Sequence, residues 1–324
     1  LNPNGDEVVP TRVLELTEEE QSFTFNGLAS RPVPSILRGF SAPIILDREV
    51  SREDRAFLLA HDTDAFNRWE ANRNLARDCL VAMVRDQAGP DTAWLDGLEH
   101  VIRDSTLDPA FRALMLSLPT QSEMAQMLFE MGTVPDPDAI WQASDNLRTH
   151  MAEAWKDFLP DLRASVAVDA PYAPDAEQSG KRALGASLLS FQTRIDGGAA
   201  AQVQYDCADN MTLQLSALAQ LVAADKADAA LKAFEHQWKD DRLVMDKWFG
   251  LQVSHAKPDV AVDIAESLVQ HPAFDMGNPN RFRAVMGGMA MNHAGFHRKD
   301  GAGYAFLADW LIKLDDKNPQ TTAR

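Results

Sequence analysis

Two histidines four residues apart are the clearest candidates for metal chemistry in this sequence. His293 and His297 bound the run HAGFH, and on a helix this spacing places both imidazoles on one face. A zinc peptidase with this spacing also needs a glutamate directly after the first histidine as general base, and alanine stands there. Because Asn292 precedes the run and Asp300 follows it, we expect a loop that binds no metal. An enzyme centre built on this pair would need a third ligand nearby.

Two arginines are the candidates for binding a negatively charged ligand. The run MGNPNRFRAVMGGMAMN, residues 276–292, contains the typical helix start Asn-Pro-Asn, so Arg281 and Arg283 fall in the first turn. Positive charge there opposes the helix dipole, which favours anions at that end. Such an arginine either pairs with a carboxylate or a helix C-terminus, or holds a ligand carboxylate or carbonyl. Residue types alone leave both alternatives open.

The remaining motifs predict structure and not chemistry. Asp246 and Lys247 stand beside two aromatics in LVMDKWF, residues 243–249, and we expect a surface ion pair next to core rings. Gly287 and Gly288 lie in an apolar helix and favour close helix packing over a phosphate contact. The sequence contains no G-x-S-x-G elbow, no P-loop and no G-x-G-x-x-G after a strand.

Helices must position these residues, because helical periodicity runs from Ser51 to the end of the chain. The expected helices are 51–61, 62–86, 92–104, 108–116, 121–131, 138–164, 178–194, 198–206, 209–223, 226–238, 242–254, 258–269, 280–292 and 302–314. Short polar loops between them are typical of antiparallel helix pairs. The fold class is therefore mainly α, an irregular α-solenoid or superhelix of armadillo or HEAT type, with a compact bundle as the alternative. Residues 170–175, APYAPD, predict a loop between two halves of the array.

The first 46 residues follow a different pattern. They are rich in β-branched and aromatic residues, and we expect strands at 8–16, 21–28 and 32–46. Three strands are marginal alone, so we interpret 1–46 as the end of a β-sandwich domain whose earlier strands are missing, and 47–324 as the helical domain.

Composition excludes several classes of function. The 324 residues carry a net charge of -17 and are 45% hydrophobic, which is globular but argues against nucleic acid or anionic membranes as partners. No apolar run approaches the roughly 20 residues of a membrane span. Cys79 and Cys207 are expected to be small buried residues, which fits a cytoplasmic protein. The first residues contain neither an initiator methionine nor a signal-peptide pattern, so targeting cannot be predicted.

Several runs resemble a known family. They are DNMT at 209–212, LVMDKWF at 243–249, NPNRFR at 278–283, DGAGY at 300–304 and NPQ at 318–320. They resemble the C-terminal region of the bacterial aminopeptidase N family, the zinc-dependent gluzincin aminopeptidases. FTF at 23–25, RPVPS at 31–35 and FSAP at 40–43 resemble the end of that family's small β-sandwich domain and its junction with the helical domain.

The resemblance implies a parent protein with four domains, of which this chain holds part of the third and most of the fourth. The family's H-E-x-x-H and G-x-M-E-N signatures are absent from this sequence. We therefore expect no catalytic residue, metal ligand or cofactor in this chain, which alone should be inactive, and zinc in the parent enzyme. The implied partners are a peptide substrate and the catalytic domain of the same polypeptide.

The resemblance also implies substrate contacts at Arg283, Gln320 and Arg324, while Arg281 is expected to pair structurally. Members of the family usually continue past this point through further helices, so we expect the helical domain to be truncated at Arg324. The predicted function is that of the C-terminal part of a metallo-aminopeptidase that releases N-terminal amino acids from peptides. The helices would form a lid and chamber wall. The alternative is a helical-repeat scaffold, without enzyme activity, that binds a protein or peptide on its concave face.

Overall fold

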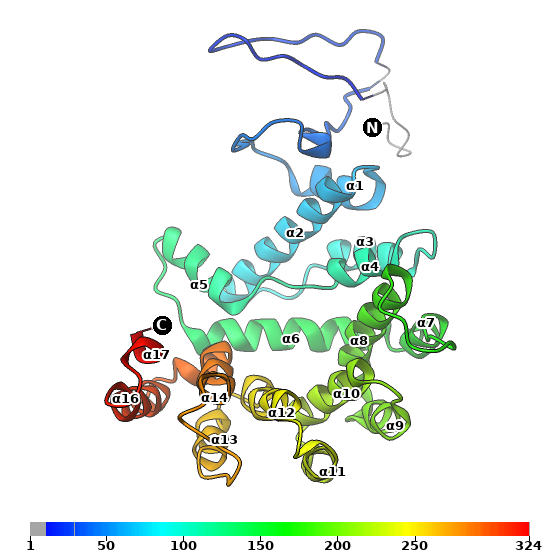
Figure 1. Cartoon of the computed structure of the whole chain (residues 1–324). Coiled ribbons are helices and arrows are strands. Elements are labelled where there is room, and N and C mark those ends of the chain that lie inside the picture. Colours follow the sequence, from blue (N-terminus) through cyan, green and yellow to red (C-terminus); the bar gives the residue numbers. More distant parts are fainter. Residues whose placement is uncertain (1–10, 29, 324) are drawn as a thin grey trace.

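The computed structural model describes residues 11–28 and 30–323, and helices dominate this part of the chain (Figure 1). The first half contains a short 3-10 helix, η1 (Arg38–Phe40), then α1 (Arg52–His61), α2 (Ala65–Asp86), α3 (Thr92–Arg103), α4 (Pro109–Met115), α5 (Gln121–Glu130), α6 (Pro137–Trp155) and α7 (Leu159–Ser165). The second half contains α8 (Ala176–Asp196), α9 (Ala199–Cys207), α10 (Met211–Ala223), α11 (Asp228–Trp238), α12 (Arg242–His255), α13 (Ala261–Leu268), α14 (Pro279–Met291), α15 (His293–Phe296), α16 (Ala302–Asp315) and α17 (Pro319–Ala323).

Helix starts follow from capping residues in the sequence. Most of the longer helices begin behind an Asp, Asn, Ser or Thr whose side chain accepts from a free backbone N–H of the first turn. Ser51 caps α1 in this way, and Thr120 and Glu123 form a reciprocal capping box at α5. Aspartates serve as N-caps at α2, α3, α4, α6, α8 and α12. A part of the strong negative charge is therefore used to begin helices.

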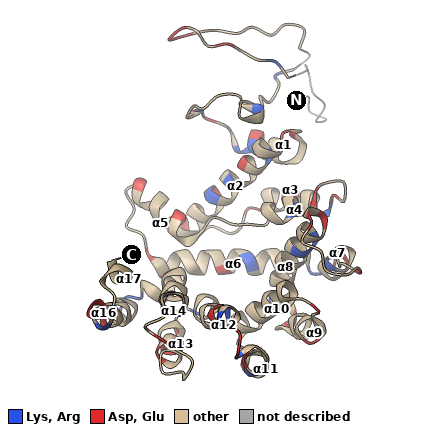
Figure 2. Cartoon of the chain, viewed as in Figure 1, with Lys and Arg blue, Asp and Glu red and all other residues tan. Residues whose placement is uncertain are grey.

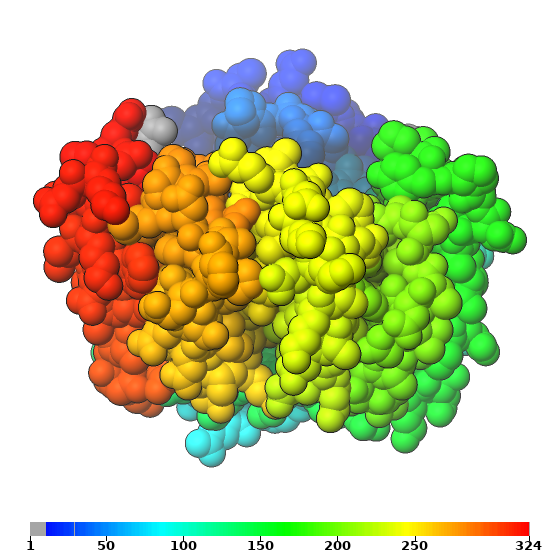
Figure 3. All heavy atoms as spheres, turned by 60° about the horizontal axis from the view of Figure 1, so that its bottom comes forward, coloured from blue at the N-terminus to red at the C-terminus, as the bar shows by residue number. Residues whose placement is uncertain are grey.

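The second half of the chain is a two-layer array. Helices α8, α10, α12 and α14 pack side by side in chain order, and α9, α11 and α13 cover one side of that row (Figure 1). From below, the helix pairs appear as successive bands of colour (Figure 3). Each pair contacts mainly its neighbours, as expected for a solenoid, so the predicted mainly helical superhelix is confirmed.

The hydrophobic core consists of two clusters that meet inside α8. Leu188 belongs to the first cluster, which extends back to Leu58, and Leu189 belongs to the second, which extends to Leu314. The predicted loop at 170–175 does separate α7 from α8. The two core clusters, however, are divided inside α8 and not at this loop. Helix α8 packs against α4, α6 and α7 as well as α9 and α10, so it joins the two halves.

A close approach between α12 and α14 depends on glycine. A Cβ at Gly288 would lie 2.9 Å from the Gly250 carbonyl oxygen, and a Cβ at Gly250 would lie 3.1 Å from the Ala284 carbonyl oxygen. The helices could not pack at this distance with larger residues. The prediction that the glycine pair serves helix packing is confirmed for Gly288, whereas Gly287 has open space around its Cα.

Three predicted elements are corrected. No strand forms in residues 11–28 and 30–46, where backbone groups bond locally, as Phe40 does to Leu37, or to side chains, as the Gly39 N–H does to Asp64. Strands need partner strands for their N–H and C=O groups, and Ile45 remains 97% exposed without one. The expected helix 138–164 is two helices, because Pro160 cannot donate to residue 156 and clashes with its carbonyl. The run at His293 is a short helix, α15, and not a loop.

An ion pair ties the end of the array back to its middle. Lys299, just after α15, places its Nζ 2.9 Å from Asp136 Oδ2 and 3.4 Å from Asp138 Oδ2 at the start of α6. Helix α15 also contacts α5 and α6. The pairing lowers the pKa of Asp136, chiefly through the hydrogen bond from Lys299.

Among the described residues, no helix is long and apolar enough to cross a membrane.

Candidate functional site

The start of α14 separates the two candidate arginines. Asn278 accepts from the backbone N–H of Asn280, and Pro279 occupies the first turn, as the sequence predicted. Two positions apart on a helix, the two side chains leave it in different directions. Arg281 is buried with 5% of its surface exposed, whereas Arg283 is exposed.

Arg281 is a structural residue that joins three segments. Its Nε donates to Asp246 Oδ1 at 2.5 Å, and its Nη groups donate to the carbonyl oxygens of Ala273 and, at 3.2 Å, Arg242. The guanidinium also lies 4.7 Å from the ring centroid of Phe249. The predicted structural pairing of Arg281 is confirmed. The expected surface pair of Asp246 with its neighbour Lys247 is wrong, because Asp246 pairs with the buried Arg281 instead.

Arg283 has no carboxylate partner in the described part of the chain. Its Nη1 donates to Asn280 Oδ1 at 3.2 Å, a neutral acceptor on the same helix turn. Gln320, on α17, is exposed, and Arg324 lies outside the described residues. Helices α14 and α17 belong to the same end of the array, yet within the described residues no hydrogen bond joins Arg283 to Gln320. The three proposed substrate contacts therefore stay predictions.

The histidine pair forms a small polar cluster with a tyrosine. The imidazole rings of His293 and His297 are 4.4 Å apart, and His297 Nδ1 lies 2.6 Å from the Tyr304 hydroxyl. Burial, followed by the neighbouring His297, lowers the pKa of His293, and its Nδ1 has no hydrogen-bond partner. Across residues 11–28 and 30–323, no group of three or more His, Cys, Asp or Glu side chains could hold a metal ion. The described residues do not fit a zinc site.

The two cysteines differ from each other. Cys79 is buried on α2, as expected, and burial raises the pKa of its thiol. Cys207 is exposed at the end of α9, so its expected burial is wrong. The amphipathic pattern around Cys207 is weak because α9 is short and rich in alanine, and the packing of α9 on α8 and α10 decides which residues are covered.

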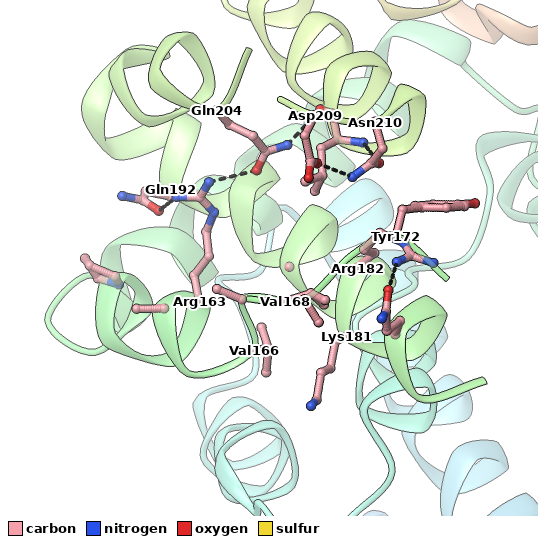
Figure 4. Close-up of a pocket in the computed structure, with 17 residues that line it drawn as sticks. Arg163, Val166, Val168, Tyr172, Lys181, Arg182, Gln192, Gln204, Asp209 and Asn210 are labelled. Carbon is pink, nitrogen blue, oxygen red and sulfur yellow. Dashed lines mark hydrogen bonds between the residues drawn. The ribbon is translucent and has the colours of Figure 1, made fainter. Parts of the chain in front are cut away.

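A cavity between α7, α8 and the start of α10 was not predicted from the sequence. Its volume is about 350 Å³, and the segment 166–173 closes one side (Figure 4). Basic residues of α7 and α8 line this cavity, although the protein as a whole is acidic (Figure 2). They are Arg163, Lys181 and Arg182. The signal that could have indicated the cavity is the pair of basic residues on α8 next to a proline-rich loop, which is weak because most such pairs are solvated.

Family models match both parts of the chain. Residues 52–324 match a family described as Domain of unknown function (DUF3458_C) ARM repeats. Residues 1–49 match one described as Domain of unknown function (DUF3458) Ig-like fold. The first of these covers most of the chain.

Curated proteins and a solved structure are similar over the whole chain. Aminopeptidase N of Caulobacter vibrioides is 37% identical over 333 residues, which is 100% of this chain and 38% of that protein. Aminopeptidase N of Escherichia coli is 35% identical over 345 residues, again 100% of this chain and 39% of that protein. The crystal structure of Legionella pneumophila aminopeptidase A in complex with aspartic acid has a TM-score of 0.84 at 28% identity. The match covers 99% of this chain and 39% of that one.

This chain thus spans less than half the length of the relatives that it matches. The helical array, the family model over 52–324 and the similarity along the entire chain agree with one another. The chain belongs to the DUF3458_C family of ARM-repeat domains and corresponds to a C-terminal region of aminopeptidase N.

Proposed function

We propose that this chain serves as the helical wall and lid of a longer zinc aminopeptidase, in which it binds the part of a peptide that lies beyond the scissile bond. The observation that carries the proposal is the match of the entire chain to aminopeptidases, including one with a solved structure. The zinc and the general base would belong to a catalytic domain of the same polypeptide. The described residues contain no group of ligands for the metal.

Arg283 is the residue proposed to meet the substrate. It is exposed, and the one hydrogen bond that its side chain makes within the described residues goes to a neutral amide, so its positive charge is available to a carboxylate or peptide carbonyl. Arg283 is the fifth residue of α14, just beyond the first turn, and no ion pair in the described residues neutralises its charge. Gln320 and Arg324 are proposed as further contacts.

The test compares substrates of different length in the full-length protein. Arg283→Ala should raise KM for peptides by about 10-fold, as expected for one lost charge-assisted hydrogen bond, and leave kcat nearly unchanged. A leucine anilide has no peptide chain beyond the bond that is cut, so its KM should change little. Lys239→Ala is the charge-matched control, because Lys239 is exposed beyond α11 in the outer layer.

Three results would refute parts of the proposal. Absence of zinc-dependent peptidase activity in the full-length protein would refute the enzyme assignment and leave the scaffold alternative. Equal peptide KM in Arg283→Ala and wild type would remove Arg283 from the substrate path. Activity in the isolated chain would instead direct attention to His293 and His297.

A further inference from the structure

The cavity between α7 and α8 contains two arginines whose side-chain hydrogen bonds, among the described residues, all go to neutral acceptors. In the described part of the chain, no acidic side chain forms an ion pair with Arg163 or Arg182. Lys181, the third cation of the cavity wall, differs from both because its Nζ pairs with Glu177 at 2.7 Å.

Arg163 is held in place by two neutral amides. Its Nη1 donates to Gln192 Oε1 at 3.3 Å and its Nη2 to Gln204 Oε1 at 2.8 Å. Gln204 in turn donates to the Leu213 carbonyl at 2.9 Å, which fixes the orientation of its amide. The Nε of Arg163 has no partner among the described residues. Burial lowers the pKa of Arg163, and the charge of Asp196, which forms no ion pair with it, partly opposes this shift.

Arg182 is more deeply buried, with 6% of its surface exposed. Its acceptors are Gln178 Oε1 at 2.9 Å, the Ala173 carbonyl at 2.8 Å and the Ser179 hydroxyl at 3.3 Å, none of them charged. Its guanidinium lies 4.5 Å from the ring centroid of Tyr172. It thereby holds the segment that closes the cavity and adds a second positive charge to the wall.

The rest of the lining limits the shape and charge of a ligand. Val166 and Val168 lie between Arg163 and Arg182 in the close-up (Figure 4), and Leu213 is a further apolar residue of the lining. Asp209 is also part of the wall, so a second negative charge on the ligand would be repelled. A cavity of about 350 Å³ holds a small molecule and not a folded segment.

We propose that this cavity is a binding site for a small monocarboxylic acid with a short branched or unbranched hydrocarbon chain. The carboxylate would lie on Arg163, whose planar fork matches it, and the hydrocarbon would lie against Val166 and Val168. This site is separate from Arg283 and requires no peptidase activity.

The test is calorimetric titration of the full-length protein with 4-methylpentanoate, and with 4-methylpentanamide as the uncharged analogue of equal shape. The acid should bind and the amide should bind at least about 10-fold more weakly, because one charge-assisted pair is lost. Arg163→Met should weaken binding of the acid by about 10- to 100-fold and abolish the preference for acid over amide. Lys239→Gln, which removes an exposed cation outside the cavity, should bind as wild type does.

A second variant tests the cavity itself. A Cβ at Gly185 would lie 3.9 Å from Val166 Cγ2, so Gly185→Ala fits, whereas the longer side chain of Gly185→Leu must occupy the cavity. Gly185→Leu should abolish binding of the acid and Gly185→Ala should retain it, and unchanged thermal unfolding of both verifies the fold. Failure of the wild type to bind the acid would overturn the proposal, as would equal affinity in Arg163→Met. Because the measurement is binding, it is independent of whether the protein cleaves peptides.

Discussion

Removal of Asp246 should destabilise the protein strongly, although Asp246 is one of 48 acidic residues in an acidic chain. The side chain of Arg281 is 6% exposed and that of Asp246 is 16% exposed. In Asp246→Ala the guanidinium stays buried without its counter-charge. Breaking a buried pair in this way costs about 3 to 5 kcal/mol in the free energy of unfolding.

Other contacts of Arg281 place the expected loss at the lower end of this range. The carbonyl oxygens of Ala273 and Arg242 still accept from the guanidinium, and Phe249 still faces it. We therefore expect a loss of about 3 kcal/mol. For a chain of this size, about 2 °C in Tm accompanies each kcal/mol, so Tm should fall by about 6 °C.

Urea unfolding followed by tryptophan fluorescence measures the effect. Trp248 is a local probe, because its ring centroid lies 5.0 Å from that of Phe249. Arg283→Ala is the control on the same helix, with an expected change within about 0.5 kcal/mol because the side chain is exposed. The double variant Asp246→Leu, Arg281→Met replaces both charges by apolar groups and should be more stable than Asp246→Ala alone. The reasoning fails if Asp246→Ala costs no more than Arg283→Ala.

Two further predictions concern other parts of the array. Gly288→Val should lower the free energy of unfolding by about 1 to 3 kcal/mol or more, because its Cβ would lie 2.9 Å from the Gly250 carbonyl oxygen. Gly287→Val is the control, because the space around Gly287 is open. Equal losses of the two variants in urea unfolding would contradict the close packing of α12 and α14. The pKa of His293 is lowered by burial, so the folded state resists protonation, and stability should fall as pH drops through the unfolded value of about 6.5. His293→Gln should reduce this slope, at most about 1.4 kcal/mol per pH unit, in thermal unfolding between about pH 5 and 7. A slope that His293→Gln leaves unchanged would contradict the assignment.

Local signals in the sequence predicted most of the helices and the start of α14. Asn278 and Pro279 determine where that helix begins through one capping bond and one fixed φ, and both act within a single turn. The same reasoning failed for strands in residues 11–28 and 30–46, because a strand depends on partners that need not be near in sequence. It also missed the break at Pro160, where the hydrophobic pattern continues through the proline.

For the candidate site, residue types identified the arginines, and the tertiary structure decided between them. Arg281 and Arg283 both stand near the start of α14, so no local signal separates a buried structural arginine from an exposed one. The separation comes from Asp246, 35 residues away on α12, and from the close crossing of α12 and α14 that glycine permits. The cavity at Arg163 likewise depends on α7, α8 and α10 meeting in space.

The sequence by itself therefore determined the helices, their caps and the family, because each is encoded in neighbouring residues or in whole runs of them. Only the tertiary structure decided which charges are neutralised, which glycines are covered and where a cavity forms. The physical reason is that burial and charge pairing depend on distances between segments, and those distances are set by the packing of the whole array.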